Sequence, residues 1–228
     1  MNGTARGHLN DEMAMQRHRM VERLRDHYKI SDQRVLDVMS ALPRHRFVPE
    51  AIKSQAYNDN ALPITGGQTI SQPYIVARMT ELLQLDGTEK VLEIGSGSGY
   101  QTAVLASLAR KIFSIERLPV LAEEADRRLR SLGFRNYSLK VDDGTEGWKV
   151  YSPYDAILVA AGGPIVPEPL TEQLRIGGKL VIPIGKDQRS QVLVRVIRTE
   201  QGLEEQNFGP CSFVPLIGTH GWESNQRG

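Results

Sequence analysis

The sequence predicts an α/β protein with a mostly parallel central sheet, and three observations support this prediction. Between residues 90 and 184, short apolar runs alternate with helical patterns, as in a parallel sheet that carries helices on both faces. The first apolar run, residues 91–94, leads directly into glycines at positions 95, 97 and 99. After residue 185 the helical patterns stop and strand-like alternation follows, so we expect antiparallel strands at the C-terminal end of the sheet.

The segment before the sheet is expected to be largely helical. Apolar spacing predicts a helix over about residues 12–27, and a second helix that a Ser31 cap starts and Pro43 stops. Residues 43–73 are richer in Pro, Gly, Asn and His, which indicates only short pieces of structure. Pro73 suits the first turn of a helix that runs to about Leu83.

The elements of the sheet region follow from the same patterns. Parallel strands are predicted over residues 90–94, 111–116, 137–141, 155–160 and 178–184. Helices are predicted over residues 100–108, 119–132 and 167–175, and the final antiparallel strands over residues 191–199 and 204–213. The arginines at 127, 128 and 130 are interpreted as a solvated face of the helix over 119–132.

Composition excludes several classes of protein. The chain has 228 residues, is 40% hydrophobic and carries 28 basic against 27 acidic residues, so its charge favours neither a nucleic acid nor an anionic membrane as partner. The single cysteine, Cys211, excludes an internal disulfide and suits a reducing compartment. Neither a signal peptide nor an apolar run of about 20 residues is present, so we expect a soluble, cytoplasmic protein. No Cys/His cluster has metal-ligand spacing, so no metal is expected.

The glycine run indicates a cofactor site. A buried strand that breaks into glycines and then a helix leaves backbone N–H groups at the positive end of that helix. NAD, FAD and S-adenosylmethionine all suit such a loop. An acidic residue that ends the second strand of such a sheet accepts hydrogen bonds from ribose hydroxyls. Here that residue is Glu116, 17 positions after Gly99.

Three details favour S-adenosylmethionine. The spacing is G-x-G-x-G, with Tyr100 rather than glycine further on, whereas dinucleotide sites have G-x-G-x-x-G. Glu93, inside the strand, suits the cationic amino group of a methionine moiety, directly or through water, and would repel a pyrophosphate. Residues 142–144, Asp-Asp-Gly, place a carboxylate where an adenine amino group would lie. We therefore expect a Rossmann-like S-adenosylmethionine-dependent methyltransferase fold with S-adenosylhomocysteine as product; a dinucleotide dehydrogenase is the weaker alternative.

A set of motifs resembles one family in particular, protein-L-isoaspartate (D-aspartate) O-methyltransferase. The resemblance spans roughly residues 20–222, and the QTISQP segment is its most specific part. In chain order the motifs are PRHRFVPE (43–50), ALPI (61–64), GQTISQP (67–73), VLEIGSGSGYQTAVLA (91–106), YDAILVAAG (154–162), LRIGGKLVIPIG (174–185) and FVPLIGTHGW (213–222).

The resemblance implies a protein repair enzyme. Such an enzyme transfers a methyl group from S-adenosylmethionine to the free α-carboxylate of L-isoaspartyl residues in damaged proteins, with D-aspartyl residues as a further candidate. The ester then converts through a succinimide to aspartate. The residues agree with this chemistry: a carboxylate with a pKa near 3.5–4 is already ionised, so the absence of a general-base constellation is expected.

The resemblance also implies site residues. The serine of the T-I-S motif, Ser71, would be the catalytic residue, although Ser71 also suits a cap for the helix that begins at Pro73. The residues expected to bind the cofactor are Thr69, Ser71, Glu93, Gly95, Ser96, Gly97, Gly99, Glu116, Asp143 and Gly144. The residues expected to bind substrate are Thr69, Ile70, Ser71, Val214, Pro215 and His220.

The sequence departs from the family at two places. The family commonly has Gly-Asp-Gly where this chain has Asp142-Asp143-Gly144, which leaves open which aspartate contacts the adenine. Thr65 stands where glycine is common.

We expect residues 1–20 to be a flexible or helical extension and residues 21–228 to form a single methyltransferase domain. Within that domain, residues 21–83 would be a helical and substrate segment, 84–185 the cofactor-binding core, and 186–228 the C-terminal strands and substrate loop. Isoaspartyl-containing proteins would be its substrates, and the enzyme is expected to be a monomer. Two alternatives stay open: a methyltransferase of another carboxylate, and a catalytically silent cofactor-binding module.

Overall fold

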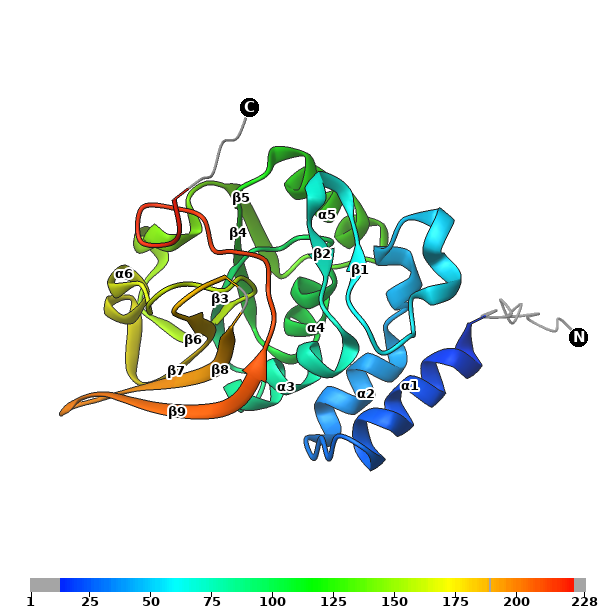
Figure 1. Cartoon of the computed structure of the whole chain (residues 1–228), viewed down its shortest axis with the longest axis horizontal. Coiled ribbons are helices and arrows are strands. Elements are labelled where there is room, and N and C mark those ends of the chain that lie inside the picture. The colour runs from blue at the N-terminus through cyan, green and yellow to red at the C-terminus, as the bar shows by residue number, and fades with distance from the viewer. Residues whose placement is uncertain (1–12, 189, 224–228) are drawn as a thin grey trace, which may run out of the picture.

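The computed structural model describes residues 13–188 and 190–223, and in this part of the chain seven strands form one central sheet (Figure 1). Its order is β5-β4-β3-β6-β7-β8-β9. The strands from β5 to β7 are parallel, and β8 and β9 continue the sheet antiparallel, as the sequence predicts. The bounds are β3 Lys90–Ile94, β4 Lys111–Glu116, β5 Tyr137–Val141, β6 Tyr154–Val159, β7 Leu174–Gly185, β8 Gln191–Thr199 and β9 Gly202–Cys211.

Two apolar cores cover the two faces of the sheet. Neighbouring residues of one strand belong to different cores because successive side chains of a strand point to opposite faces. Val91 packs with the larger core, formed with α1 to α5, whereas Leu92 packs with the smaller core, which includes Leu170 of α6. The helices are α1 Ala14–Asp26, α2 Gln33–Ala41, α3 Pro73–Leu83, α4 Tyr100–Leu108, α5 Pro119–Ser131 and α6 Glu168–Glu172.

The largest difference from the predicted elements lies between residues 167 and 178. The expected helix over 167–175 is only the short α6, because the chain from Leu174 already pairs with β6 through Tyr154. Gln173 fixes this early turn: its buried amide accepts from the Trp148 N–H at 2.8 Å and donates to the Glu146 carbonyl at 2.8 Å. A glycine pair at 177–178 interrupts the apolar pattern of β7, which explains why the sequence indicates a later start.

The predicted Ser31 cap of α2 is wrong, because Asp32 fills that role. Asp32 Oδ1 accepts hydrogen bonds from the backbone N–H groups of Arg34 and Val35, at 3.0 and 3.3 Å. Ser31 instead donates to the Glu81 carboxylate of α3, from its backbone N–H at 2.6 Å and its hydroxyl at 3.0 Å. The start of α2 is therefore tied to α3.

The N-terminal region is described only from residue 13, so the expected disorder of residues 1–10 lies outside the described residues. Helix α1 spans the expected boundary between the extension, residues 1–20, and the domain, residues 21–228, and it buries Met20 and Leu24 in the larger core. In residues 13–188 and 190–223, no helix is both long enough and apolar enough to cross a membrane.

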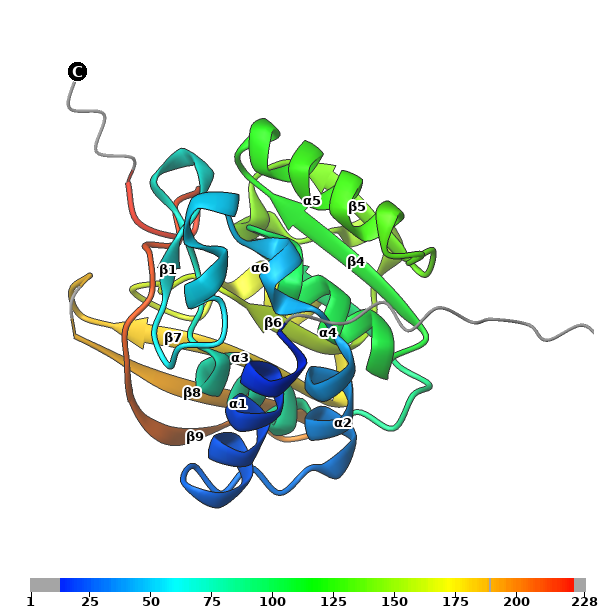
Figure 2. The ribbon, with the colours of Figure 1, turned by 90° about the vertical axis from the view of Figure 1, so that its right-hand side faces the viewer.

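The topology places a crevice at one edge of the sheet. From β3 the chain moves outward through β4 to β5 and then returns to place β6 on the other side of β3. At such a reversal the loops that leave the two adjacent strands diverge, and ligands of open α/β sheets bind there, at the carboxyl ends of the strands. Figure 2 shows α5 beside β4 and β5. The segment of β1 and the red C-terminal segment lie together on the other side of the molecule, away from α5.

We predict that Asp32→Ala lowers the free energy of unfolding by about 1 kcal/mol, because two helix N–H groups lose their acceptor. Urea denaturation measures the effect. Asp32→Asn is the matched control, since asparagine caps a helix about as well as aspartate. An unchanged denaturation midpoint for Asp32→Ala would show that the cap does not stabilise α2.

Candidate functional site

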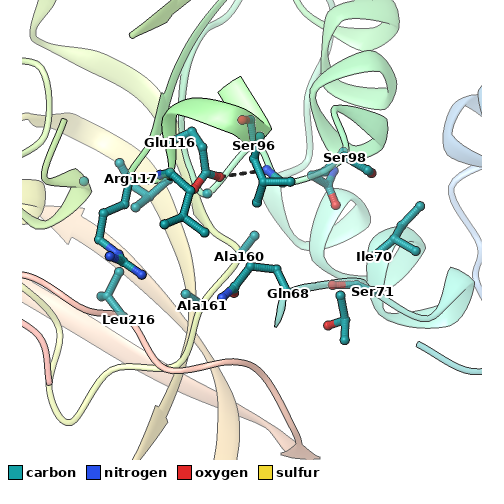
Figure 3. Close-up of a pocket in the computed structure, with 18 of the residues that line it drawn as sticks. Gln68, Ile70, Ser71, Ser96, Ser98, Glu116, Arg117, Ala160, Ala161 and Leu216 are labelled. Atoms are coloured by element: carbon teal, nitrogen blue, oxygen red, sulfur yellow. Dashed lines mark hydrogen bonds between the residues drawn. The ribbon is translucent and has the colours of Figure 1, made fainter. Parts of the chain in front are cut away.

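A pocket lies at the carboxyl ends of β3, β4 and β6 (Figure 3). The space inside it is about 910 Å³, counting the part that is open to solvent. Segments far apart in the sequence form its wall: residues 68–71, 94–98, 115–118, 160–161 and 215–217, together with Gly144 and side chains of α3, α4 and α5.

The glycine loop takes backbone conformations that favour glycine. Gly95, Gly97 and Gly99 have φ angles of 88°, 51° and 88°, all in the left-handed region. A Cβ atom on Gly99 would lie 3.2 Å from the Cβ of Ala125, so glycine also lets the loop pack against α5. The loop therefore brings bare backbone to the pocket wall, as the sequence indicates.

Glu116 ends β4 and faces the glycine loop. Its Oε2 accepts from the Gly97 N–H at 2.9 Å, the bond drawn in Figure 3, and its Oε1 accepts from the Leu118 N–H at 3.0 Å. Each carboxylate oxygen can accept a second hydrogen bond. Glu116 lines the pocket, so this spare capacity is available to the hydroxyls of a ribose.

One buried hydroxyl of a pocket-lining residue, Ser96 Oγ, has no partner among the described residues, whereas the buried Tyr100 hydroxyl lies beside the Arg44 guanidinium. A buried polar group without a hydrogen bond costs free energy, and such groups in a pocket indicate a polar ligand. The bare loop, the ribose-type carboxylate and the Ser96 hydroxyl fit S-adenosylmethionine.

Glu93 is fully buried behind the glycine loop and does not line the pocket. Its Oε2 accepts from Thr102 of α4 and from Ser114 of β4, both at 2.6 Å, while Oε1 has no partner among the described residues. Burial raises the pKa of Glu93 to about 7, against the opposing effect of the Ser114 and Thr102 hydrogen bonds. Its contact with a cofactor amino group stays a prediction.

Asp143 ties the turn that contains Gly144 to the C-terminal segment. Its Oδ1 accepts from the N–H and the hydroxyl of Thr145, at 2.9 and 2.7 Å, and its Oδ2 accepts from the Thr219 N–H at 2.7 Å. Asp142 instead pairs with Lys140 at 2.6 Å. Of this turn only Gly144 lines the pocket, and a Cβ on Gly144 would lie 2.3 Å from Ile94 Cγ2. The structure leaves the choice of adenine ligand between the two aspartates open.

The segment that carries the T-I-S motif forms the opposite wall. Residues 69 and 70 are strand β2, Thr69–Ile70, which pairs antiparallel with β1, Leu62–Pro63. Ile70 is buried, and all of residues 68–71 line the pocket. The residue that caps α3 is Gln72, and within the described residues no side chain makes the capping bond. The alternative role of Ser71 as a helix cap is therefore wrong.

The C-terminal segment crosses the pocket at Gly162. The Gly162 N–H donates to the Val214 carbonyl at 2.8 Å, and the Gly162 carbonyl accepts from the Leu216 N–H at 2.8 Å and from the Trp222 indole at 2.9 Å. This places Pro215 in the pocket wall, whereas Val214 packs against the smaller core. His220 lies outside the wall, with its Nε2 3.1 Å from Glu146 Oε1.

Several wall residues were not predicted. Arg117, Ala160 and Ala161 directly follow strands, and their position at the carboxyl ends of β4 and β6 is a signal that could have found them. Gln68, Leu216 and Ile217 lie within the GQTISQP and FVPLIGTHGW motifs but were not singled out as site residues.

The interpretation of Arg128 as part of a solvated face is wrong. Its Nη1 donates to the Ser98 carbonyl of the glycine loop at 3.3 Å, and its Nη2 pairs with Glu124 at 2.9 Å. Glu124 also accepts from the Thr65 hydroxyl at 3.0 Å. Thr65 is thus joined through α5 to the glycine loop.

Comparison with known proteins identifies the family. The family model described as Protein-L-isoaspartate(D-aspartate) O-methyltransferase matches residues 15–221. The chain belongs to this family. The protein-L-isoaspartate O-methyltransferase of Syntrophus aciditrophicus is 54% identical over 217 residues, which are 94% of this chain and 99% of that protein.

Solved structures agree with this membership. A protein-L-isoaspartate O-methyltransferase superimposes with a TM-score of 0.82 at 30% identity, covering 90% of this chain and 67% of that chain. A putative protein-L-isoaspartate O-methyltransferase from Plasmodium falciparum, solved in complex with S-adenosyl-L-homocysteine, has a TM-score of 0.76 at 24% identity and shares the fold; the match covers 88% of this chain and 98% of that one. The resemblance in the sequence motifs is confirmed, as is the methyltransferase fold.

We predict that Glu93 makes the stability of this family member fall as pH rises. Because burial raises the pKa of Glu93 to about 7 from 4.5, the folded protein binds the proton more tightly than the unfolded chain does. The free energy of unfolding then decreases between about pH 4.5 and 7, by up to about 3 kcal/mol, and this loss is complete above pH 7.

Denaturation of wild type and Glu93→Gln at several pH values tests this. Glutamine keeps an oxygen that can accept from Thr102 and Ser114 but cannot ionise, so the difference between the two proteins should change over this pH range. A constant difference from pH 5 to 8 would contradict a raised pKa.

Proposed function

We propose that this chain is a protein repair methyltransferase that transfers a methyl group from S-adenosylmethionine to the free α-carboxylate of L-isoaspartyl residues. One observation carries the proposal: the T-I-S segment lies in the wall of the same pocket that contains the glycine loop and Glu116. In Figure 3 Ser71 and Glu116 lie on opposite sides of that pocket, so a cofactor whose ribose is held by Glu116 would extend its methyl end toward Ser71.

The cofactor would be held by groups that already face the pocket. Glu116 would accept from the ribose hydroxyls, and the backbone of Gly95 and Gly97 with the Ser96 hydroxyl would surround the methionine moiety. Gly144 would lie against the adenine. When bound, S-adenosylmethionine supplies a methyl group on a positively charged sulfur.

The substrate carboxylate needs alignment rather than activation. It is already ionised at neutral pH, so no base has to remove a proton. The Ser71 hydroxyl, with Thr69 beside it, would donate to one carboxylate oxygen and direct the other at the methyl carbon. The new O–CH₃ bond forms as the C–S bond breaks, and both charges disappear. Such alignment supplies on the order of 7–11 kcal/mol in favourable cases.

The remaining features of the proposal follow from composition and family. We infer a single methyltransferase domain over residues 21–228, in which segment 21–83 and the C-terminal loop serve the substrate. We also infer a cytoplasmic monomer with isoaspartyl-containing proteins as substrates and no metal. The near-neutral net charge of +1 and the single cysteine support this setting.

Methyl transfer to matched peptides tests the function. We predict transfer to a peptide with one L-isoaspartyl residue and none to the same peptide with aspartate, because only the first presents a free α-carboxylate on the extended linkage. The transfer is measured as the methanol that base releases from the peptide methyl ester. Transfer to neither peptide by a protein that still binds S-adenosylhomocysteine would indicate a silent module, and transfer only to other carboxylates a different substrate class.

Ser71→Ala should lower kcat by about 10-fold to 100-fold, because a single misplaced hydrogen-bonding group in a reacting complex costs this much. The affinity for S-adenosylhomocysteine, measured by calorimetry, should change little. Ser107→Ala is a control, because Ser107 lies on α4 with its hydroxyl bonded to the Ala103 carbonyl at 2.9 Å, outside the pocket. Full activity of folded Ser71→Ala would contradict the role of this hydroxyl.

A further inference from the structure

Arg44 lies directly behind the substrate side of the pocket and is fully buried. It begins the short 3₁₀ helix Arg44–Phe47. Its Nη2 donates to the Ser71 carbonyl at 2.7 Å, and its Nε donates to the Ala56 carbonyl at 2.7 Å. The guanidinium therefore holds the main chain of the T-I-S motif from the side opposite the pocket.

The same guanidinium supports a second wall residue. The guanidinium carbon of Arg44, Cζ, lies 4.8 Å from the centroid of the Tyr100 ring. That ring packs edge-on against Phe47. Tyr100 and Ser71 both line the pocket, whereas Arg44 does not. A planar, rigid group that donates in fixed directions can fix both neighbours at once, which a lysine ammonium cannot do.

The charge of Arg44 is not balanced by an acid. Among the described residues no carboxylate pairs with it: its charge is stabilised by the hydroxyls of Tyr100 and Tyr57, and its Nη1 makes no hydrogen bond of good geometry. Burial lowers the pKa of Arg44 to about 10, so it remains a cation at neutral pH. A buried charge without an opposite charge is costly, and an anion bound in the adjacent pocket would offset part of that cost.

We propose that Arg44 is a positioning residue for methyl transfer, which fixes the Ser71 main chain and the Tyr100 ring and makes the acceptor subsite electropositive toward the substrate carboxylate. This proposal rests on the proposed function, because it takes the region of Ser71 as the acceptor subsite. Arg44 acts through these two wall residues and does not touch the methyl group.

Two substitutions separate the two effects. Arg44→Lys keeps the positive charge but cannot hold both carbonyls and lie on the ring, so kcat should fall about tenfold or more. Arg44→Met removes the charge as well, so the KM for the isoaspartyl peptide should rise about tenfold beyond that of Arg44→Lys. The Kd for S-adenosylhomocysteine should stay within about twofold in both variants, because no hydrogen bond of Arg44 reaches Glu116 or the glycine loop.

Arg198→Lys is the matched control. Arg198 also donates to main-chain carbonyls, those of Thr171, Glu172 and Leu174, but lies outside the pocket. Its kinetic constants should match those of wild type. An unchanged kcat in folded Arg44→Lys would overturn the proposal, and so would equal KM values for Arg44→Lys and Arg44→Met.

Wild-type protein gives the answer if the variants do not fold. The ¹⁵Nε–H signal of Arg44, assigned through its proximity to Tyr100, should shift when an isoaspartyl peptide binds the S-adenosylhomocysteine complex. The same peptide with its α-carboxylate converted to an amide should leave the signal in place. Identical responses to both peptides would overturn the proposal. Wild-type activity is measured first, so that a failure of the proposed function is recognised independently.

Discussion

The hydrogen bond from the Gly97 N–H to Glu116 joins the ends of two neighbouring parallel strands. It lies at the point where β3 turns into α4, and it ties the glycine loop to the carboxylate at the end of β4, which lines the pocket. The left-handed backbone of Gly97 allows its N–H to reach that carboxylate. Neighbouring parts of the pocket wall are attached to the same loop and strand. Arg128 of α5 donates to the Ser98 carbonyl of the glycine loop, and Gly144 packs against Ile94 at the end of β3.

Much of the sheet could be predicted because its central strands, such as β3 and β4, are almost entirely buried and apolar. The apolar runs of β3, β4 and β5 have the predicted limits, as do α4 and β8. Where a polar side chain forms a long-range bond, periodicity carries no information. The hydrogen bonds of Gln173 to Trp148 and Glu146, which end α6 early, are therefore not visible in the sequence pattern. The same holds for the Ser31 hydroxyl, which bonds to Glu81 and does not cap α2.

The candidate site was predictable where backbone conformation or a strand end determines a residue, as at Gly97, Glu116 and Gly144. It was not predictable where charges are buried. Arg44 and Glu93 are both fully buried, and their neighbours come from distant parts of the chain. Charged residues are almost never fully buried unless they are paired. The sequence alone therefore assigns residues such as Arg44 and Glu93 to the surface or to a ligand.

The C-terminal wall of the pocket has a consequence for biosynthesis. Residues 215–217 are synthesised long after the glycine loop, yet both line the same pocket. Asp143, which anchors this segment through the Thr219 N–H, is synthesised 76 residues before Thr219. A nascent chain that has emerged only as far as β9 has the loop and Glu116 but lacks this wall. The nascent chain should therefore retain a cofactor only late in translation, after the sheet has formed and the C-terminal segment has closed the pocket.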